Sequence, residues 1–162
     1  MPFSIQVDGL KELAGKLDKL PEKAADVAAL ALYDGAGTVA DRVRREVQGI
    51  STEPFKYAQG GRKRKASPEE KELLMNAPWG IAKFKRKGVV IETSVGMENA
   101  GYADLVGKRV PIPQIANAIN SGTSFREKQP FLRKAFTQSR KAAEAAIDAG
   151  IKAHEDLLDI GD

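Results

Sequence analysis

Residues 115–136 read Ile-Ala-Asn-Ala-Ile-Asn-Ser-Gly-Thr-Ser-Phe-Arg-Glu-Lys-Gln-Pro-Phe-Leu-Arg-Lys-Ala-Phe, and no other stretch of the chain is as informative. Gly122 predicts a turn, because glycine adopts backbone conformations that a Cβ would hinder. A short polar link follows. Pro130 then predicts the start of a helix that runs to about Leu158, since its fixed φ and missing N–H suit the first helical position. Residues 115–120 should form a brief ordered segment, whose type the pattern leaves open.

Towards the amino end, apolar spacing predicts further helices. Residues 3–7 alternate apolar with polar side chains and are typical of a short strand. Asp8 can cap a helix whose leucines recur every three or four residues up to Leu20. A second apolar pattern runs from Glu22 to about Val47, and a helix of this length would measure roughly 39 Å at 1.5 Å per residue.

The region between the long helices carries loop, cap and hairpin signals. Residues 49–67 contain paired glycines and a basic run without periodicity, which predicts a long flexible loop. Ser67-Pro68-Glu69-Glu70 is a capping box with proline, and it predicts a short helix that stops at Asn76-Ala77-Pro78. Two apolar runs, 81–84 and 89–95, predict a β-hairpin with Lys85-Arg86-Lys87-Gly88 at its tip. Residues 96–113 are interpreted as loop.

These elements predict an α+β fold, in which two long helices pack on a small antiparallel sheet with a β-hairpin and a long basic loop. A chain of 162 residues is expected to form one domain, 1–162, and can bury a core without metals or disulfides. Aromatic residues make up only 6% of the chain, so the core should be thin and helix-rich.

Composition restricts the functional classes. The chain has no cysteine, which excludes disulfides, thiolate nucleophiles and cysteine-ligated zinc. The start of the chain lacks the features of a secretion signal, and the longest apolar run, 27–33, is far shorter than the roughly 20 residues of a membrane span. We therefore expect a soluble protein that has no membrane partner and is intracellular when made.

Catalytic groups are scarce. The only histidine, His154, stands beside Glu155 on the polar end of the last predicted helix, where a solvated surface position is expected. Glu69, Glu70 and Glu72 fall in the first turn of a helix, where the helix dipole favours negative charge. With one histidine and no cysteine, a zinc site would need mostly carboxylate ligands. We predict no enzymatic activity, no metal and no cofactor.

Two basic clusters allow two interpretations. The net charge of +4 and the pI of about 9.3 are modest for a DNA-binding protein. Nonspecific contact with DNA phosphates is one use of the clusters, and solvation or contact with another protein is the interpretation we favour. The clusters are Arg62, Lys63, Arg64 and Lys65, and Lys85, Arg86 and Lys87.

The motif at 120–124, Asn-Ser-Gly-Thr-Ser, followed by Pro-Phe-Leu-Arg-Lys-Ala-Phe at 130–136, resembles the carboxyl-terminal signature of the gene-ten-like tail-component family of long-tailed bacteriophages. The amino-terminal part agrees, because residues 7–13 and 35–40 resemble the opening of the same family. The resemblance covers roughly residues 3–48 and 79–158.

The resemblance implies a tail completion or head–tail joining protein of the phage neck. Such a subunit is present in the virion and, during assembly, in the host cytoplasm. The six-fold symmetry of these tails implies a hexameric ring between the connector or stopper and the tail terminator, with passing contact to genomic DNA left open. The alternative is a nonspecific DNA-binding protein that uses the basic loop.

The matched residues make physical sense as scaffold and interface. Arg126 and Arg133 are predicted interface groups, since the guanidinium fork suits carboxylates on an adjoining subunit. The basic residues Arg62, Lys63, Arg64, Lys65, Lys85 and Arg86 are further interface candidates. Structural roles are expected for Gly122, Thr123, Pro130, Phe131 and Phe136, with the two phenylalanines in the core.

Overall fold

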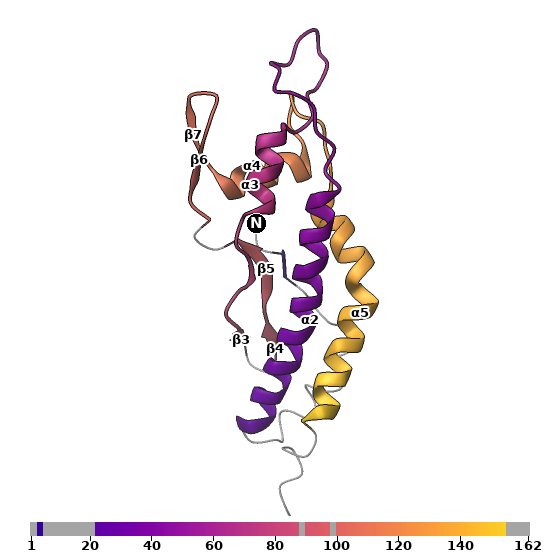
Figure 1. The fold of residues 1–162 in the computed structure, drawn as a ribbon. Coiled ribbons are helices and arrows are strands. Elements are labelled where there is room, and N and C mark those ends of the chain that lie inside the picture. Colours follow the sequence, from indigo (N-terminus) through magenta and orange to yellow (C-terminus); the bar gives the residue numbers. More distant parts are fainter. Residues whose placement is uncertain (1–2, 5–21, 88–89, 98–99, 155–162) are drawn as a thin grey trace, which may run out of the picture. The chain divides into compact units, whose positions relative to one another are not determined.

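The computed structural model describes residues 3–4, 22–87, 90–97 and 100–154 (Figure 1). The predicted helix between Asp8 and Leu20 and the end of the last helix near Leu158 lie outside these residues. The fold is α+β, with the long helices α2 (Glu22–Gln48) and α5 (Phe131–Ala153) packed together and several small antiparallel sheets. Contacts divide the chain into two compact units: unit 1 comprises 41–79 and 97–138, and unit 2 comprises 2–40, 80–96 and 139–162.

In unit 2 the two long helices approach each other closely through small residues. A Cβ built on Gly35 would lie 2.6 Å from Cγ1 of Ile147, and one on Gly150 would lie 3.0 Å from Cα of Ala31. Leu32 completes a buried apolar cluster with Ala31 and Ile147. The predicted spine helix is therefore confirmed, and glycine within it allows close packing of the helices.

Each of the small sheets contains an antiparallel strand pair. One has the strand order β1 (Phe3–Ser4), β5 (Ser94–Met97), β2 (Trp79–Ile81). β3 (Lys85–Lys87) pairs with β4 (Val90–Glu92), so the predicted hairpin exists. Its basic cluster is part of a strand, however, and not its tip as predicted. Opposite charges contribute to this pairing, because Lys85 stands across from Glu92 in the register and Lys87 Nζ lies 3.9 Å from the Glu92 carboxylate.

The glycines of α2 provide a test of this packing. We expect Gly35→Ala to lower the free energy of unfolding, because overpacking costs about 1–3 kcal/mol and outweighs the gain in helix propensity of about 1 kcal/mol. Gly37 is the matched control, since the nearest atom to its Cβ position is 4.0 Å away. Gly37→Ala should be stabilising. Chemical denaturation of both variants gives the answer, and stabilisation by both would show that the helices can separate at Gly35.

Unit 1 contains two short helices, α3 (Pro68–Met75) and α4 (Ile112–Ser121). The predicted capping box of α3 is confirmed: the Ser67 hydroxyl accepts from the Glu70 N–H at 3.2 Å, and the Glu70 carboxylate accepts from the Ser67 N–H at 2.9 Å. The ordered segment 115–120, of open type in the sequence, belongs to α4.

The interpretation of residues 96–113 as loop is wrong. They include the end of β5 and a second hairpin, β6 (Tyr102–Leu105) with β7 (Lys108–Pro111). Val106 and Gly107 connect the strands with φ values of 50° and 73°. Two successive residues with positive φ are what a type I′ hairpin turn requires, but valine is unusual there, which is why the sequence did not signal it.

The core of unit 1 joins α3 to the start of α5. Trp79 Nε1 donates to the Leu74 carbonyl at 2.8 Å, and the Trp79 and Phe131 rings meet edge to face with centroids 6.1 Å apart. Phe131 is buried as predicted, whereas Phe136 is only half-buried.

Helix α5 begins at Phe131, one residue after Pro130, whose carbonyl accepts from the Lys134 N–H at 3.0 Å. Pro130 therefore lies one residue before the first helical position, the position predicted for it, and its carbonyl accepts a hydrogen bond from the first turn of the helix.

Candidate interaction groove

Residues 120–136, which we call the signature segment, hold the start of the basic loop, residues 49–67. The side-chain amide of Gln129 forms paired hydrogen bonds with the backbone of Ser51: its Oε1 accepts from the Ser51 N–H at 2.9 Å and its Nε2 donates to the Ser51 carbonyl at 2.9 Å. The Gln129 N–H in turn donates to the carbonyl of Ile119 at 2.8 Å. One glutamine therefore fastens the loop to α4.

The same segment holds the end of the loop. The backbone N–H of Arg64 donates to the Phe125 carbonyl at 3.0 Å, and the backbone carbonyl of Arg64 accepts from the Glu127 N–H at 2.9 Å. Thr123 shapes this contact, since its hydroxyl accepts from the Arg126 N–H at 3.0 Å. Gly122 permits it, because its φ is 73° and a Cβ there would lie 3.0 Å from the Lys128 Cβ. The predicted structural roles of Gly122 and Thr123 are thus explained.

The base of the loop is closed by its own hydrogen bonds. The Glu53 N–H donates to the Ala66 carbonyl at 2.9 Å, and the Glu53 carboxylate accepts from the Lys65 N–H at 2.7 Å, which lowers the pKa of that carboxyl. Residues 54–63 project beyond this base, and we call them the arm. Gly60 and Gly61 turn its tip with φ values of 59° and 76°.

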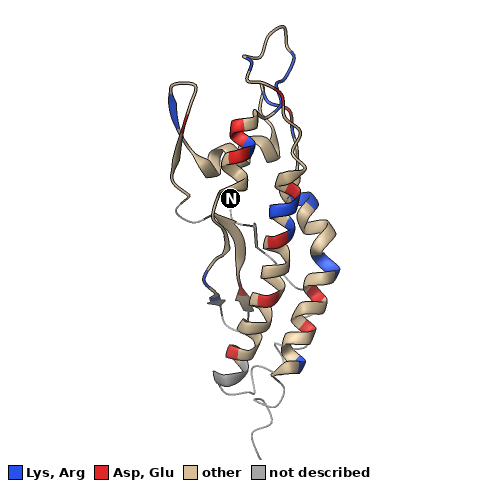
Figure 2. Ribbon diagram, viewed as in Figure 1, with Lys and Arg blue, Asp and Glu red and all other residues tan. Residues whose placement is uncertain are grey.

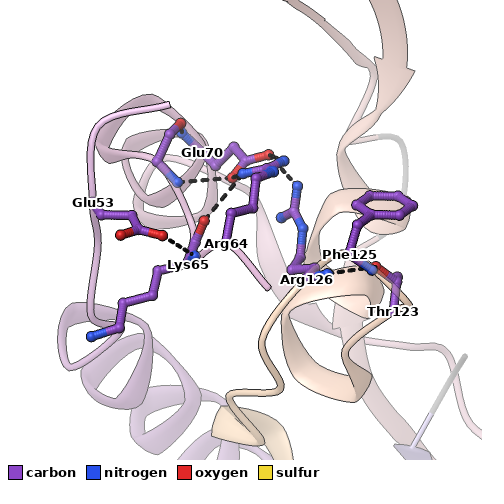
Figure 3. A network of polar contacts seen from close by, with 8 residues as sticks. Glu53, Arg64, Lys65, Glu70, Thr123, Phe125 and Arg126 are labelled. Atoms are coloured by element: carbon purple, nitrogen blue, oxygen red, sulfur yellow. Dashed lines mark hydrogen bonds and ion pairs between the residues drawn. The ribbon is translucent and has the colours of Figure 1, made fainter. Parts of the chain in front are cut away.

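A buried ion cluster lies where the loop, α3 and the signature segment meet (Figure 3). Glu70 is 3% exposed, and its oxygens accept from Arg64 Nη1 and Nη2 at 3.1 and 3.0 Å and from Arg126 Nη2. Burial opposes ionisation of Glu70, but the hydrogen bonds from Arg64, the Ser67 N–H and Arg126 outweigh it and lower its pKa. Glu70 is therefore a carboxylate at neutral pH.

Arg126 was predicted to reach a carboxylate of an adjoining subunit, and this expectation needs correction. Its side chain is buried, the residue is 5% exposed, and the carboxylate that it binds is Glu70 of the same chain. The buried Nε and Nη1 atoms of Arg126 have no hydrogen-bond partner among the described residues. Arg64 is likewise engaged by Glu70 and is not a free member of its basic cluster.

A groove of about 1060 Å³ lies beside this cluster, within unit 1. The arm, α3, the β6–β7 hairpin, α4 and the signature segment all contribute to its walls. Large apolar side chains with substantial exposure line it, and they come from three separate segments: Phe55 and Tyr57 of the arm, Val106 of the β6–β7 turn and Phe125 of the signature segment. Exposed apolar side chains gathered in one concavity are typical of an interaction site.

Val106 is the most unusual residue of this groove. It is 54% exposed, and it is the one non-glycine residue of positive φ in the described part of the chain. A β-branched side chain is strained in this conformation, and such residues gather at functional sites. The apolar side chain at the turn costs stability that an Asn-Gly turn would not.

The remaining predicted interface residues lie on various elements. Arg62 and Lys63 are exposed on the arm, and Lys65 is half-buried at its base. Figure 2 shows the basic residues of the loop and of the β6–β7 hairpin. Arg133 is exposed on the first turn of α5, and Lys85 is exposed on β3. The side chain of Arg86 lies outside the described part.

The described residues contain no group of three or more histidine, cysteine, aspartate or glutamate side chains placed to hold a metal ion. Within the same residues, no helix is both long and apolar enough to cross a membrane.

Neither the groove nor the ion cluster was predicted from the sequence. The available signal was the pair Phe55 and Tyr57 inside a loop that is otherwise polar.

No protein-family profile, curated protein or solved structure matches the chain.

Proposed function

We propose that the protein is a structural subunit of the bacteriophage neck, a tail completion or head–tail joining protein that forms a ring between the connector or stopper and the tail terminator. The observation that carries the proposal is the role of the signature segment in unit 1. Residues 122–129, which lie within the stretch that resembles the tail-component family, fasten the arm and line one wall of the groove. Of these residues, Gly122 and Thr123 match the signature and shape the segment, whereas 125–129 form the link between its two matched motifs.

The chemistry of these residues agrees with a binding role. Gly122 allows a turn, Thr123 accepts backbone N–H groups, and Gln129 binds the Ser51 backbone. Each acts on the protein's own backbone. The groove is lined by aromatic and aliphatic side chains together with polar and charged ones, and such a mixed surface suits contact with another protein chain.

A DNA-binding protein is the second candidate, and one feature of the arm favours it. Exposed basic residues, Lys56, Arg62 and Lys63, stand on the same ten-residue stretch as Phe55 and Tyr57. Aromatic and basic side chains together are typical of single-strand binding surfaces. The engagement of Arg64 by Glu70 weakens this case. Binding of single-stranded and duplex DNA that falls steeply with salt would support it.

Placement in the virion tests the neck proposal. We expect mass spectrometry of purified virions to find the protein at low copy number, and deletion of its gene to leave heads and tails unjoined. Complementation with the wild-type chain is the control and should restore joined particles. Absence of the protein from virions would contradict the neck assignment, and joined particles in the deletion strain would contradict the role in joining.

A further inference from the structure

We infer that the groove of one subunit binds the acidic segment 155–162 of a second copy of the chain. The inference rests on the proposed function, because a ring forms when one surface of each subunit meets a different surface of the next. The segment reads Glu-Asp-Leu-Leu-Asp-Ile-Gly-Asp and combines carboxylates with large aliphatic side chains. It lies outside the described residues.

The apolar part of the groove suits the leucine and isoleucine side chains of this segment. Phe125 is 53% exposed and Val106 is 54% exposed, and both line the groove together with the more buried Leu73 and Ile115. Burial of apolar surface contributes about 25 cal/mol per Å² removed from water. A concavity of about 1060 Å³ can hold several side chains of a peptide segment.

The lining of the groove carries four basic and four acidic side chains, so its charge is balanced overall and the excess of positive charge is confined to the buried cluster. Arg64 and Arg126 share the single carboxylate of Glu70, which leaves one excess positive charge in the buried cluster. Arg126, which lines the groove, keeps Nε and Nη1 buried without an acceptor among the described residues. A buried donor without an acceptor is costly, and a carboxylate is the acceptor that a guanidinium binds most strongly. An incoming aspartate or glutamate supplies the second carboxylate, and with it the hydrogen-bond acceptor, that the cluster lacks.

Val106 adds an independent indication. Its strained conformation places an apolar side chain at the groove where asparagine would fit the turn better. A valine in this strained position is explained if a partner's aliphatic side chain packs against it. Val106→Asn is consequently a variant that should keep the fold and weaken binding.

Crosslinking between isotopically distinct copies tests the contact. The full chain with p-benzoylphenylalanine in place of Phe125 is mixed with ¹⁵N-labelled wild-type protein, irradiated and digested with trypsin. We expect crosslinks from the unlabelled groove to the labelled peptide that follows Lys152. The same photoreactive residue in place of Tyr33, an exposed aromatic residue of unit 2, is the control and should give no mixed-isotope crosslink to that peptide.

Every other result overturns the inference. Crosslinks only within unlabelled chains would mean that the segment binds its own subunit. Crosslinks to a different labelled segment would mean another occupant, and no crosslink would mean that the groove is not this interface.

Binding of a labelled synthetic peptide gives the second measurement. Fluorescence anisotropy of the peptide 153–162 with the full chain should show saturable binding, weakened about ten-fold or more by Val106→Asn or Phe125→Ala. A peptide with amides in place of its side-chain carboxylates should also bind about ten-fold or more weakly, because it loses charged hydrogen bonds. Equal binding of the amidated peptide would show that Arg126 does not recognise a carboxylate and would overturn the inference.

The proposed neck function and the inferred binding of segment 155–162 in the groove can be contradicted independently of each other. A protein found in virions whose groove gives no mixed-isotope crosslink remains a neck subunit that assembles through another surface. A protein that is absent from virions but gives the expected crosslink self-associates through the groove in a different assembly.

Discussion

Replacement of Glu70 by glutamine is expected to lower the free energy of unfolding at pH 7 by about 3–5 kcal/mol, the cost of leaving buried charges without their partner. Glu70 is the carboxylate that Arg64 and Arg126 share, and it also accepts from the Ser67 N–H. The amide of glutamine carries no charge and places an N–H₂ group against donors. Urea denaturation of both proteins measures the difference.

The pH dependence of this difference follows from the lowered pKa of Glu70. A carboxyl whose pKa is lower in the folded state stabilises the fold above its unfolded pKa, about 4.3. That contribution is lost as the pH falls through the folded pKa. The stability gap between wild type and Glu70→Gln should therefore be constant near neutral pH and shrink in acid.

Glu69→Gln is the matched control, because Glu69 lies in the same helical turn but is exposed. The change should alter stability far less. Equal effects at Glu69 and Glu70 would show that the carboxylates act through the helix dipole, and that the ion cluster adds nothing.

The parts of the fold that the sequence predicted are those fixed by nearby residues. The capping box at 67–70 needs only a hydroxyl, a proline and a carboxylate at set spacing, and all its hydrogen bonds join residues three apart. Helix α2 follows from apolar residues at helical spacing. In both cases the information is contained within a few turns of chain.

The second hairpin could not be recognised in the same way. β6 and β7 are four residues each, and the turn between them places valine where asparagine or glycine would give a signal. Short strands with charged residues do not show the alternation that distinguishes a half-buried strand from a loop.

The candidate site was the least predictable part. The carboxylate partner of Arg126 was predicted from the sequence to lie on an adjoining subunit, whereas the structure places it on Glu70 of the same chain, 56 positions away, and no local pattern links the two. The basic run 62–65 was treated as one cluster, whereas the fold separates its members. Arg64 turns inward to Glu70, while Arg62 and Lys63 remain exposed. Contacts between distant residues depend on the tertiary fold, which composition and spacing do not determine.

Phe131→Ala is expected to cost about 3–5 kcal/mol, the usual range for a phenylalanine removed from a core. Phe131 is 4% exposed, and its ring packs edge to face against Trp79, which is itself held by its bond to the Leu74 carbonyl. The truncation leaves a cavity where the start of α5 meets the end of α3. Thermal and urea denaturation should both show the loss.

Phe125→Ala is the matched control, because it makes the same substitution six residues earlier on an exposed side chain. Surface substitutions usually change stability by no more than about 0.5 kcal/mol, so this variant should unfold like wild type while losing peptide binding. Phe136→Ala should fall between the two, since its ring is half-buried. If Phe125→Ala unfolds as early as Phe131→Ala, the Phe125 side chain supports the arm and its exposure is not evidence for a partner. If Phe131→Ala is stable, the Trp79 side chain can fill the space, and the start of α5 is held mainly by the hydrogen bonds of Gln129.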